Sequence, residues 1–214
     1  MDLILQEDDG ILVPPTNFSA VEDSCIYRSG FPQPSNFPFL KSLNLSSIIC
    51  LCPEPYPEEN LEFLHFNKVK LFQFGMDGTK EPSAMSRSAI TEALKVLTDV
   101  RNHPVLIHCK RGKHRTGCIV GCLRKWQSWC LSSVMDEYKQ FAGAKWRETD
   151  MKFLETYDAS CESSFVMAMA MVMGSPGAAK KKLQNSSPRA IQNLCYIFSW
   201  CLHLRGKNKS CKNN

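Results

Sequence analysis

The sequence has no apolar run long enough to cross a bilayer. A membrane-spanning helix needs about 18–20 consecutive apolar residues. The apolar run at 165–173 has nine residues, and a second run at 194–204 is interrupted by Ser199 and His203. The sequence therefore predicts a protein without a transmembrane segment.

A signal-peptide pattern is also lacking. Residues 1–9 are acidic and have neither a basic n-region nor a long apolar h-region. Eleven cysteines would otherwise suggest disulfides, but several of them, such as Cys50 and Cys118, stand in apolar patterns. An unpaired cysteine often serves as a small core residue. We therefore expect unpaired thiols and a reducing compartment, the cytoplasm or alternatively the nucleus.

A strongly basic domain is absent, and so are internal repeats. The net charge is +5, but residues 159–214 contain eight basic residues and one acidic residue, so residues 1–158 carry −2. Such a balance gives no reason to expect a nucleic-acid partner. We predict three regions: a flexible N-terminal arm at 1–16, a globular domain at 17–158, and a poorly ordered basic C-terminal extension at 159–214.

Strand and helix patterns alternate along the globular domain. Apolar, β-branched runs predict buried strands, and apolar residues at helical spacing predict amphipathic helices. The alternation predicts an α/β fold with a mostly parallel central sheet flanked by helices, although the strand order cannot be read. Residues 29–38, with one glycine and three prolines, are expected to be loop. Expected strands are 25–28, 46–52, 69–74 and 105–108, and expected helices are 58–66, 90–97, 119–126, 132–144 and 151–157.

The stretch 105–117 carries the pattern that points to chemistry. A buried strand ends at His108, Cys109 follows, and Arg115 stands six positions later, just before an apolar helix. A short turn of this kind can direct backbone N–H groups toward one centre, and such a nest at a helix N-terminus binds phosphate. Gly112 gives the turn the backbone freedom that it needs.

This spacing predicts a phosphatase whose nucleophile is Cys109. The loop N–H groups and the helix dipole favour a thiolate, which attacks phosphorus and forms a phosphocysteine intermediate. Arg115 is predicted to clamp the phosphate oxygens with its planar guanidinium. Thr116 is predicted to hydrogen-bond the sulfur, and His108 to orient the loop from behind.

Basic side chains are concentrated around the predicted loop, in a domain that is otherwise slightly acidic. This local charge suits a ligand that bears many phosphates. The predicted substrate-binding residues are Lys110, Arg111, Gly112, Lys113 and His114 in the loop, and Lys80 in a neighbouring loop.

The general acid is predicted to be Asp77, with Glu81 as the alternative. Both lie in a polar loop, and glycines on either side of Asp77 would let that segment move. A phosphoanhydride has a better leaving group than a serine ester, so it needs less help from an acid.

A zinc site is an alternative on residue types alone. Its spacing matches no common ligand pattern, and the neighbouring cations would repel a metal ion. We expect neither a metal nor an organic cofactor. The residues considered for zinc are His108, Cys109, His114 and Cys118.

The stretch from His108 to Gly117 resembles the signature of the protein tyrosine phosphatase superfamily. Its very basic loop resembles one branch, the plant and fungal atypical dual-specificity phosphatases. Weaker matches at 17–18, 27–32, 71–75 and 80–82 extend the likeness over 17–158. The resemblance implies the cysteine-phosphatase (tyrosine phosphatase-like) fold. It also implies removal of the β-phosphate at the 5-position of inositol pyrophosphates. The segment after residue 159 does not resemble the usual ending of this branch.

Two other functions remain open at this point. One is a protein tyrosine or dual-specificity phosphatase that acts on a signalling protein. The other is a weakly catalytic module that binds polyphosphates. The sequence does not indicate an oligomeric state.

Overall fold

A computed structural model describes residues 12–23, 25–77 and 87–159 of the chain. Its centre is a five-stranded sheet in the order β1-β2-β5-β3-β4. Strand β1 runs antiparallel to β2, whereas β2, β5, β3 and β4 are parallel, so the predicted mostly parallel sheet is confirmed. The strands are β1 (Ser19–Glu22), β2 (Ile26–Ser29), β3 (Ser47–Cys50), β4 (Lys70–Gln73) and β5 (Val105–His108).

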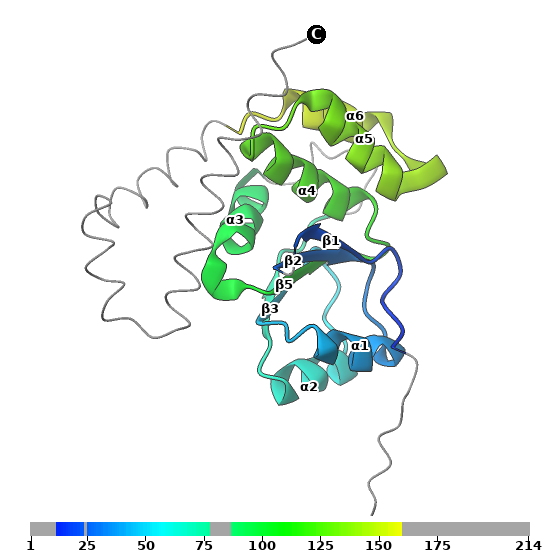
Figure 1. Ribbon diagram of the computed structural model, residues 1–214, viewed down its shortest axis with the longest axis vertical. Coiled ribbons are helices and arrows are strands. Elements are labelled where there is room, and N and C mark those ends of the chain that lie inside the picture. Colours follow the sequence, from blue (N-terminus) through cyan, green and yellow to red (C-terminus); the bar gives the residue numbers. More distant parts are fainter. Residues whose placement is uncertain (1–11, 24, 78–86, 160–214) are drawn as a thin grey trace, which may run out of the picture.

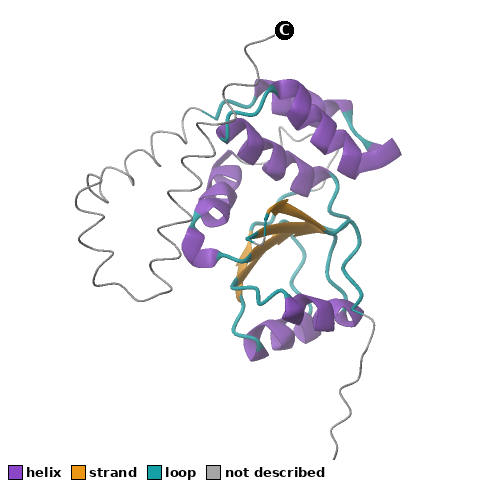
Figure 2. Ribbon diagram, in the orientation of Figure 1, coloured by secondary structure: helices purple, strands orange, loops and turns teal. Residues whose placement is uncertain are grey.

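Helices cover both faces of the sheet. Figures 1 and 2 show α1 and α2 on one side of the sheet and α3, α4, α5 and α6 on the other. The α-helices are α1 (Phe37–Ser42), α2 (Glu58–Phe66), α3 (Arg87–Thr98), α4 (His114–Trp126), α5 (Leu131–Ala142) and α6 (Glu148–Thr156). Short 3₁₀ turns occupy Pro34–Asn36, Val100–Asn102 and Gly143–Lys145.

The two central strands, β3 and β5, are buried along their whole length. Parallel strands that are covered on both faces require continuous apolar runs rather than alternation. The runs Ile48-Ile49 and Leu106-Ile107 meet this requirement and are at most 1% exposed. The predicted apolar stripe of α3 is also confirmed, because its four residues face the core: Ile90, Ala93, Leu94 and Leu97.

Two elements were not expected from the sequence at all. Strand β1 lies in residues that gave no strand signal in the sequence. The signal is missing because β1 is a four-residue edge strand with an irregular register. Helix α1 begins at Phe37, inside the segment expected to be loop. Pro38 stands in the first turn of α1, where a missing N–H costs nothing, so this proline starts the helix rather than breaking it.

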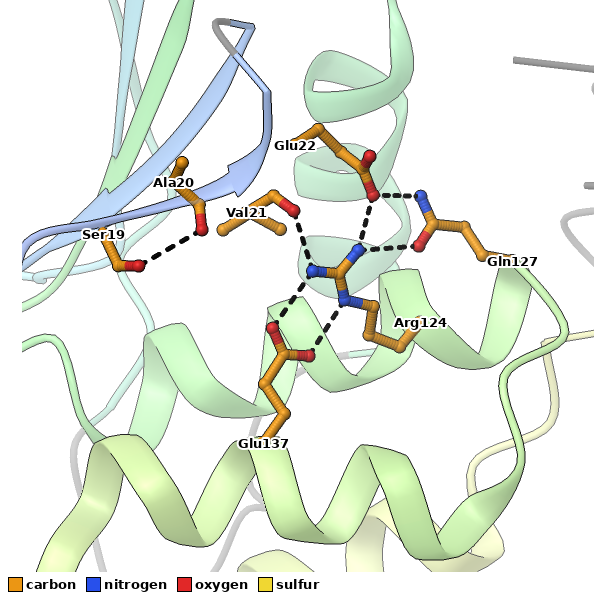
Figure 3. Close-up of polar contacts among 7 residues, drawn as sticks. All are labelled: Ser19, Ala20, Val21, Glu22, Arg124, Gln127 and Glu137. Carbon is orange, nitrogen blue, oxygen red and sulfur yellow. Dashed lines mark hydrogen bonds and ion pairs between the residues drawn. The ribbon is translucent and has the colours of Figure 1, made fainter. Parts of the chain in front are cut away.

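Arg124 ties α4 to β1 and α5 (Figure 3). Its side chain is 6% exposed, and all three of its nitrogens donate hydrogen bonds. Nε and Nη2 hold the two carboxylate oxygens of Glu137 at 2.9 and 3.1 Å, and Nη2 also donates to the Val21 carbonyl at 2.8 Å. Nη1 donates to Glu22 and Gln127. A buried charge with this many partners fixes the packing of these three elements.

No helix within the described ranges is both long enough and apolar enough to cross a membrane. Lys80, Glu81 and residues 160–214 of the predicted C-terminal extension lie outside the described residues.

Candidate active site

The turn between β5 and α4 holds the predicted nucleophile. Strand β5 lies between β2 and β3, with both neighbours parallel to it. Cys109 follows β5 directly and is 3% exposed, and α4 begins at His114. The predicted loop between a buried strand and a helix is therefore present, at the carboxyl edge of the parallel strands where α/β proteins bind ligands.

Gly112 is fitted tightly into this loop. Its φ is +66°, in the region that side chains disfavour. A Cβ at this position would lie 2.5 Å from both the carbonyl carbon and the carbonyl oxygen of Ser29. The loop consequently needs glycine for two reasons, its backbone conformation and its close approach to the end of β2.

Two side chains outside the loop hold the Gly112 carbonyl. Arg28 Nη2 and Asn17 Nδ2 each donate to this oxygen at 3.0 Å. Asn17 also donates to the Phe141 carbonyl at 3.2 Å, which links the loop to the end of α5. The loop is therefore fastened from β2, from the segment before β1 and from α5.

Arg115 connects the first turn of α4 to two other loops. Its Nη1 donates to the Leu51 carbonyl at 3.0 Å and to the Met76 carbonyl at 3.1 Å. Leu51 follows β3, and Met76 follows β4 in the chain. The guanidinium thus lies at the same edge of the sheet as Cys109, and its role as a phosphate clamp stays a prediction.

His108 is fully buried at the end of β5. Its Nε2 lies 3.2 Å from the hydroxyl of Tyr56, and its ring meets that of Phe31 edge to face at 4.9 Å. Burial lowers the pKa of His108 to about 3, against an opposing effect from the backbone of Cys109. The imidazole is therefore neutral at pH 7, and one hydrogen bond joins its Nε2 to the Tyr56 hydroxyl.

Thr116 places its hydroxyl inside the protein. Its Oγ1 is buried and has no hydrogen-bond partner among the described residues. A buried hydroxyl without a partner is costly, so a functional partner would account for its position. The structure shows no bond from Thr116 to the Cys109 sulfur, and that bond stays a prediction for the working enzyme.

The basic residues of the loop divide into two kinds. Lys110 and Arg111 are exposed. Lys113 Nζ donates to the Ala142 carbonyl at the end of α5 at 3.2 Å, and His114 Nε2 lies 2.7 Å from the Lys145 carbonyl in the turn that follows. All four stay predicted substrate contacts.

A hollow of about 500 Å³ lies beside the loop. Arg111 and Lys113 line it, together with Asn17 and Gln140. Its lining includes neither Cys109 nor Arg115 and contains no carboxylate, so it offers space for an anionic group next to the predicted phosphate site.

Asp77 is exposed and follows Met76, the residue whose carbonyl Arg115 holds. This bond brings the loop after β4 to the first turn of α4. Asp77 therefore stands near the mouth of the loop, and its role as general acid stays a prediction. The other acid candidate, Glu81, and the predicted contact Lys80 are outside the described residues.

No group of three or more histidine, cysteine, aspartate or glutamate side chains within the described part of the chain could hold a metal ion. The zinc alternative therefore has no ligand set there. Arg28, Asn17 and Tyr56 had no role in the sequence prediction, although Asn17 and Arg28 both stand in stretches that carry the family resemblance.

Comparisons with known proteins agree with this geometry. A family profile described as the tyrosine phosphatase family matches residues 12–174. The protein named inositol diphosphatase DSP3 from Arabidopsis thaliana is 65% identical over 162 residues, which cover 74% of this chain and 79% of that protein. Inositol diphosphatase DSP5 from the same plant is 54% identical over 195 residues, covering 90% of this chain and 95% of that protein.

Solved structures show the same fold. The core catalytic domain of the PP-IP phosphatase SIW14 from S. cerevisiae superposes with a TM-score of 0.70 at 45% identity, covering 74% of this chain and 96% of that chain. P. aeruginosa TpbA has a TM-score of 0.56 at 20% identity over 72% of this chain and 91% of that chain, a likeness of fold alone. The loop geometry, the family profile and these relatives lead to one conclusion: the chain belongs to the tyrosine phosphatase family.

Proposed function

We propose that this protein is a cysteine-dependent phosphatase that removes the β-phosphate from the 5-position of inositol pyrophosphates. The observation that carries the proposal is the strand-loop-helix turn, with Cys109 directly after buried β5 and Arg115 in the first turn of α4. Two relatives, 65% and 54% identical, are named inositol diphosphatases, and they support the substrate class.

The first chemical step transfers the terminal phosphoryl group to the enzyme. The loop N–H groups and Arg115 bind its oxygens, and the Cys109 thiolate attacks the phosphorus. The S–P bond forms as the bond between phosphorus and the bridging oxygen breaks. The departing inositol phosphate takes a proton from Asp77, or leaves as the anion because a phosphate is a good leaving group.

The second step releases the phosphate. Water attacks the phosphorus of phosphocysteine and the P–S bond breaks, which regenerates the thiolate. The proton of the water returns to Asp77 if that residue gave one in the first step, and otherwise leaves with the inorganic phosphate. A hydrogen bond from Thr116 would stabilise the departing sulfur. His108, neutral and bound to Tyr56, would keep the turn in place throughout. Every group in this scheme belongs to the chain or to the substrate, and no cofactor takes part.

The non-reacting phosphates of an inositol pyrophosphate would meet the basic residues around the loop. Arg111 and Lys113 line the adjoining hollow, and Lys110 is exposed beside the nucleophile. A substrate with one phosphate would leave these charges unused. This arrangement favours a densely phosphorylated substrate over a phosphotyrosine side chain.

The test is phosphate release from 5-diphosphoinositol pentakisphosphate, compared with release from a phosphotyrosine peptide. We expect faster turnover of the inositol pyrophosphate, with release abolished and ligand binding retained in Cys109→Ser. The matched control is Cys130→Ser, a cysteine at the N-cap of α5 where serine is a favourable residue. Faster turnover of the peptide would instead make the protein a tyrosine or dual-specificity phosphatase.

The third candidate, a polyphosphate-binding module without catalysis, gives a different result. The wild-type protein and Cys109→Ser would then bind the ligand equally and release no phosphate. We also propose a cytoplasmic or nuclear location, which the free thiols among the described residues support, namely Cys25, Cys50, Cys52, Cys109 and Cys118.

A further inference from the structure

Arg28 is buried behind the loop. It belongs to β2, is 1% exposed, and donates from Nη2 to the Gly112 carbonyl at 3.0 Å. Its guanidinium carbon lies 3.7 Å from the ring centre of Phe141, which covers one face of the cation. This arginine therefore contacts the loop from the side opposite the solvent.

The environment of Arg28 differs from that of Arg124, the other arginine that is buried among the described residues. Arg124 donates from all of its nitrogens (Figure 3). In Arg28, by contrast, Nε and Nη1 are buried and have no hydrogen-bond partner within the part of the chain that the structure describes. A buried cation with unsatisfied donors is costly unless an anion offsets its charge.

Nearby charges identify where that anion would lie. A Cβ at Gly117, in the first turn of α4, would be 3.8 Å from Arg28 Nη2, so the cation sits beside the positive end of the helix. Burial lowers the pKa of Arg28 to about 10, and the charges that oppose this effect are Glu137 and Cys109. Both oxygens of Glu137 are already held by Arg124. The remaining counter-charge is the anion inside the loop.

The bond to Gly112 also has a geometric consequence. In a planar trans peptide the C=O and the following N–H point in opposite directions. Arg28 and Asn17 hold the Gly112 carbonyl away from the centre of the loop. The N–H of Lys113 is therefore turned the other way, toward the centre of the loop. That N–H is one of the donors that a bound phosphate requires.

We propose that Arg28 is a positioning residue that turns the Gly112–Lys113 peptide toward the bound anion and supplies a buried positive charge behind Cys109. The proposal rests on the assignment of Cys109 as the nucleophile. It does not depend on which phosphorylated compound is the substrate.

The charge of Arg28 acts on Cys109 alongside several other groups. The other ionisable groups near this turn are Arg115 and Cys118 in α4, His108 in β5, Cys50 in β3, Cys52 after β3, and Lys110 in the loop. Burial raises the pKa of Cys118 and lowers that of His108 to about 3, so both stay neutral between pH 5 and 9. A hydrogen bond from Cys50 lowers the pKa of Cys52 to about 7. Cys52 titrates alike in every variant below, so differences between variants report on Arg28.

The experiment measures the rate at which iodoacetamide alkylates Cys109 between pH 4.5 and 9.5, with Cys109 identified by peptide mass spectrometry. We expect Arg28→Met to raise the midpoint of the pH profile by about one unit, because a nearby positive charge is lost. Arg28→Lys should keep the wild-type midpoint, because it retains the charge. Arg28→Lys should also lower kcat for phosphate release about tenfold, because an ammonium group replaces the planar guanidinium.

Asn17→Gly is the matched control. It removes the other donor to the Gly112 carbonyl without changing any charge, and the φ of +57° at Asn17 suits glycine. Its midpoint should equal that of the wild type. Circular dichroism establishes which variants are folded, and Arg28→Gln replaces Arg28→Met if the methionine variant is not.

A folded neutral variant with the wild-type midpoint would overturn the proposal. So would an Arg28→Lys protein whose midpoint rises by about one unit, because a retained charge should prevent that change. Since alkylation needs no substrate, these outcomes are independent of the assay that tests inositol pyrophosphate turnover.

Discussion

A Cβ on Gly112 would lie 2.5 Å from the carbonyl carbon and oxygen of Ser29. The loop that carries the nucleophile therefore rests directly on the end of β2. The glycine is required by the packing of two segments that are far apart in the sequence.

This contact predicts the effect of Gly112→Ala. The added methyl must push the loop away from β2, and a displacement of about 1 Å in a catalytic site can cost about 100-fold in rate. We expect kcat/KM for phosphate release to fall by at least that factor, measured with the inositol pyrophosphate.

Gly143→Ala is the matched control for this substitution. Gly143 also has a positive φ of +59°, but a Cβ there would meet nothing within 4 Å. The alanine should cost about 1–3 kcal/mol of unfolding free energy while kcat/KM changes only a few-fold. Equal losses of kcat/KM in Gly112→Ala and Gly143→Ala would contradict the claim that the clash with Ser29 displaces the loop.

A second prediction concerns stability below pH 7. His108 has a pKa of about 3 in the folded protein because it is buried, whereas an unfolded histidine has a pKa of about 6.5. The unfolded state therefore binds the extra proton first, so the stability present above pH 6.5 is lost as the pH falls toward 3. Between pH 7 and pH 5 the wild type should lose about 2 kcal/mol through His108.

Urea unfolding at these two pH values measures this loss. His108→Gln should remove most of it, since glutamine does not titrate and its amide can still hydrogen-bond the Tyr56 hydroxyl. His65→Gln, at an exposed position of α2, should keep the wild-type loss. An identical pH dependence in all three proteins would refute this account of His108.

A third prediction concerns the general acid. Asp77→Asn should reduce turnover of a phosphoserine peptide more than turnover of the inositol pyrophosphate, because an alkoxide leaves far less readily than a phosphate. General acid catalysis contributes about 10²–10⁴-fold, so we expect about a 100-fold loss for the peptide and a much smaller loss for the pyrophosphate.

Asp136→Asn, at an exposed position of α5, serves as the comparison and should change neither rate. Equal losses on both substrates in Asp77→Asn would argue for a binding role, and no loss on either would remove Asp77 from the mechanism.

The hollow beside the loop gives a fourth prediction. Arg111→Ala removes one of its two cations, and a hydrogen bond to a charged group contributes about 1.5–3 kcal/mol. We expect kcat/KM for the inositol pyrophosphate to fall about 10-fold or more, and kcat/KM for p-nitrophenyl phosphate to fall far less. Lys41→Ala, on α1, controls for the loss of one positive charge. A loss of the same size on both substrates would show that the hollow does not select for additional phosphates.

The sequence was sufficient to predict the parts of the site that are contiguous. Strand β5 and helix α2 have the predicted bounds, and the loop that begins at Cys109 lies where the apolar run ends. These features depend on local sequence patterns, namely an apolar run, a cysteine, a glycine and apolar residues at helical spacing.

The supports of the loop could not be predicted in the same way. Arg28 is 84 residues from Gly112, and Tyr56 is 52 residues from His108. Their contacts exist because β2 and β3 lie on either side of β5, and that strand order has no local signal in the sequence. The functional meaning of Arg28 therefore becomes readable only once the sheet is assembled.

The most direct test of the central claim is to trap the covalent intermediate. Wild-type protein and Cys130→Ser are mixed with excess inositol pyrophosphate, denatured within milliseconds, and digested for mass spectrometry. The account predicts a phosphoryl group on the peptide that contains Cys109 in both proteins, and none in Cys109→Ser. The account would be contradicted if phosphate were released while that peptide stayed unphosphorylated, and if Cys109→Ser released phosphate at the wild-type rate.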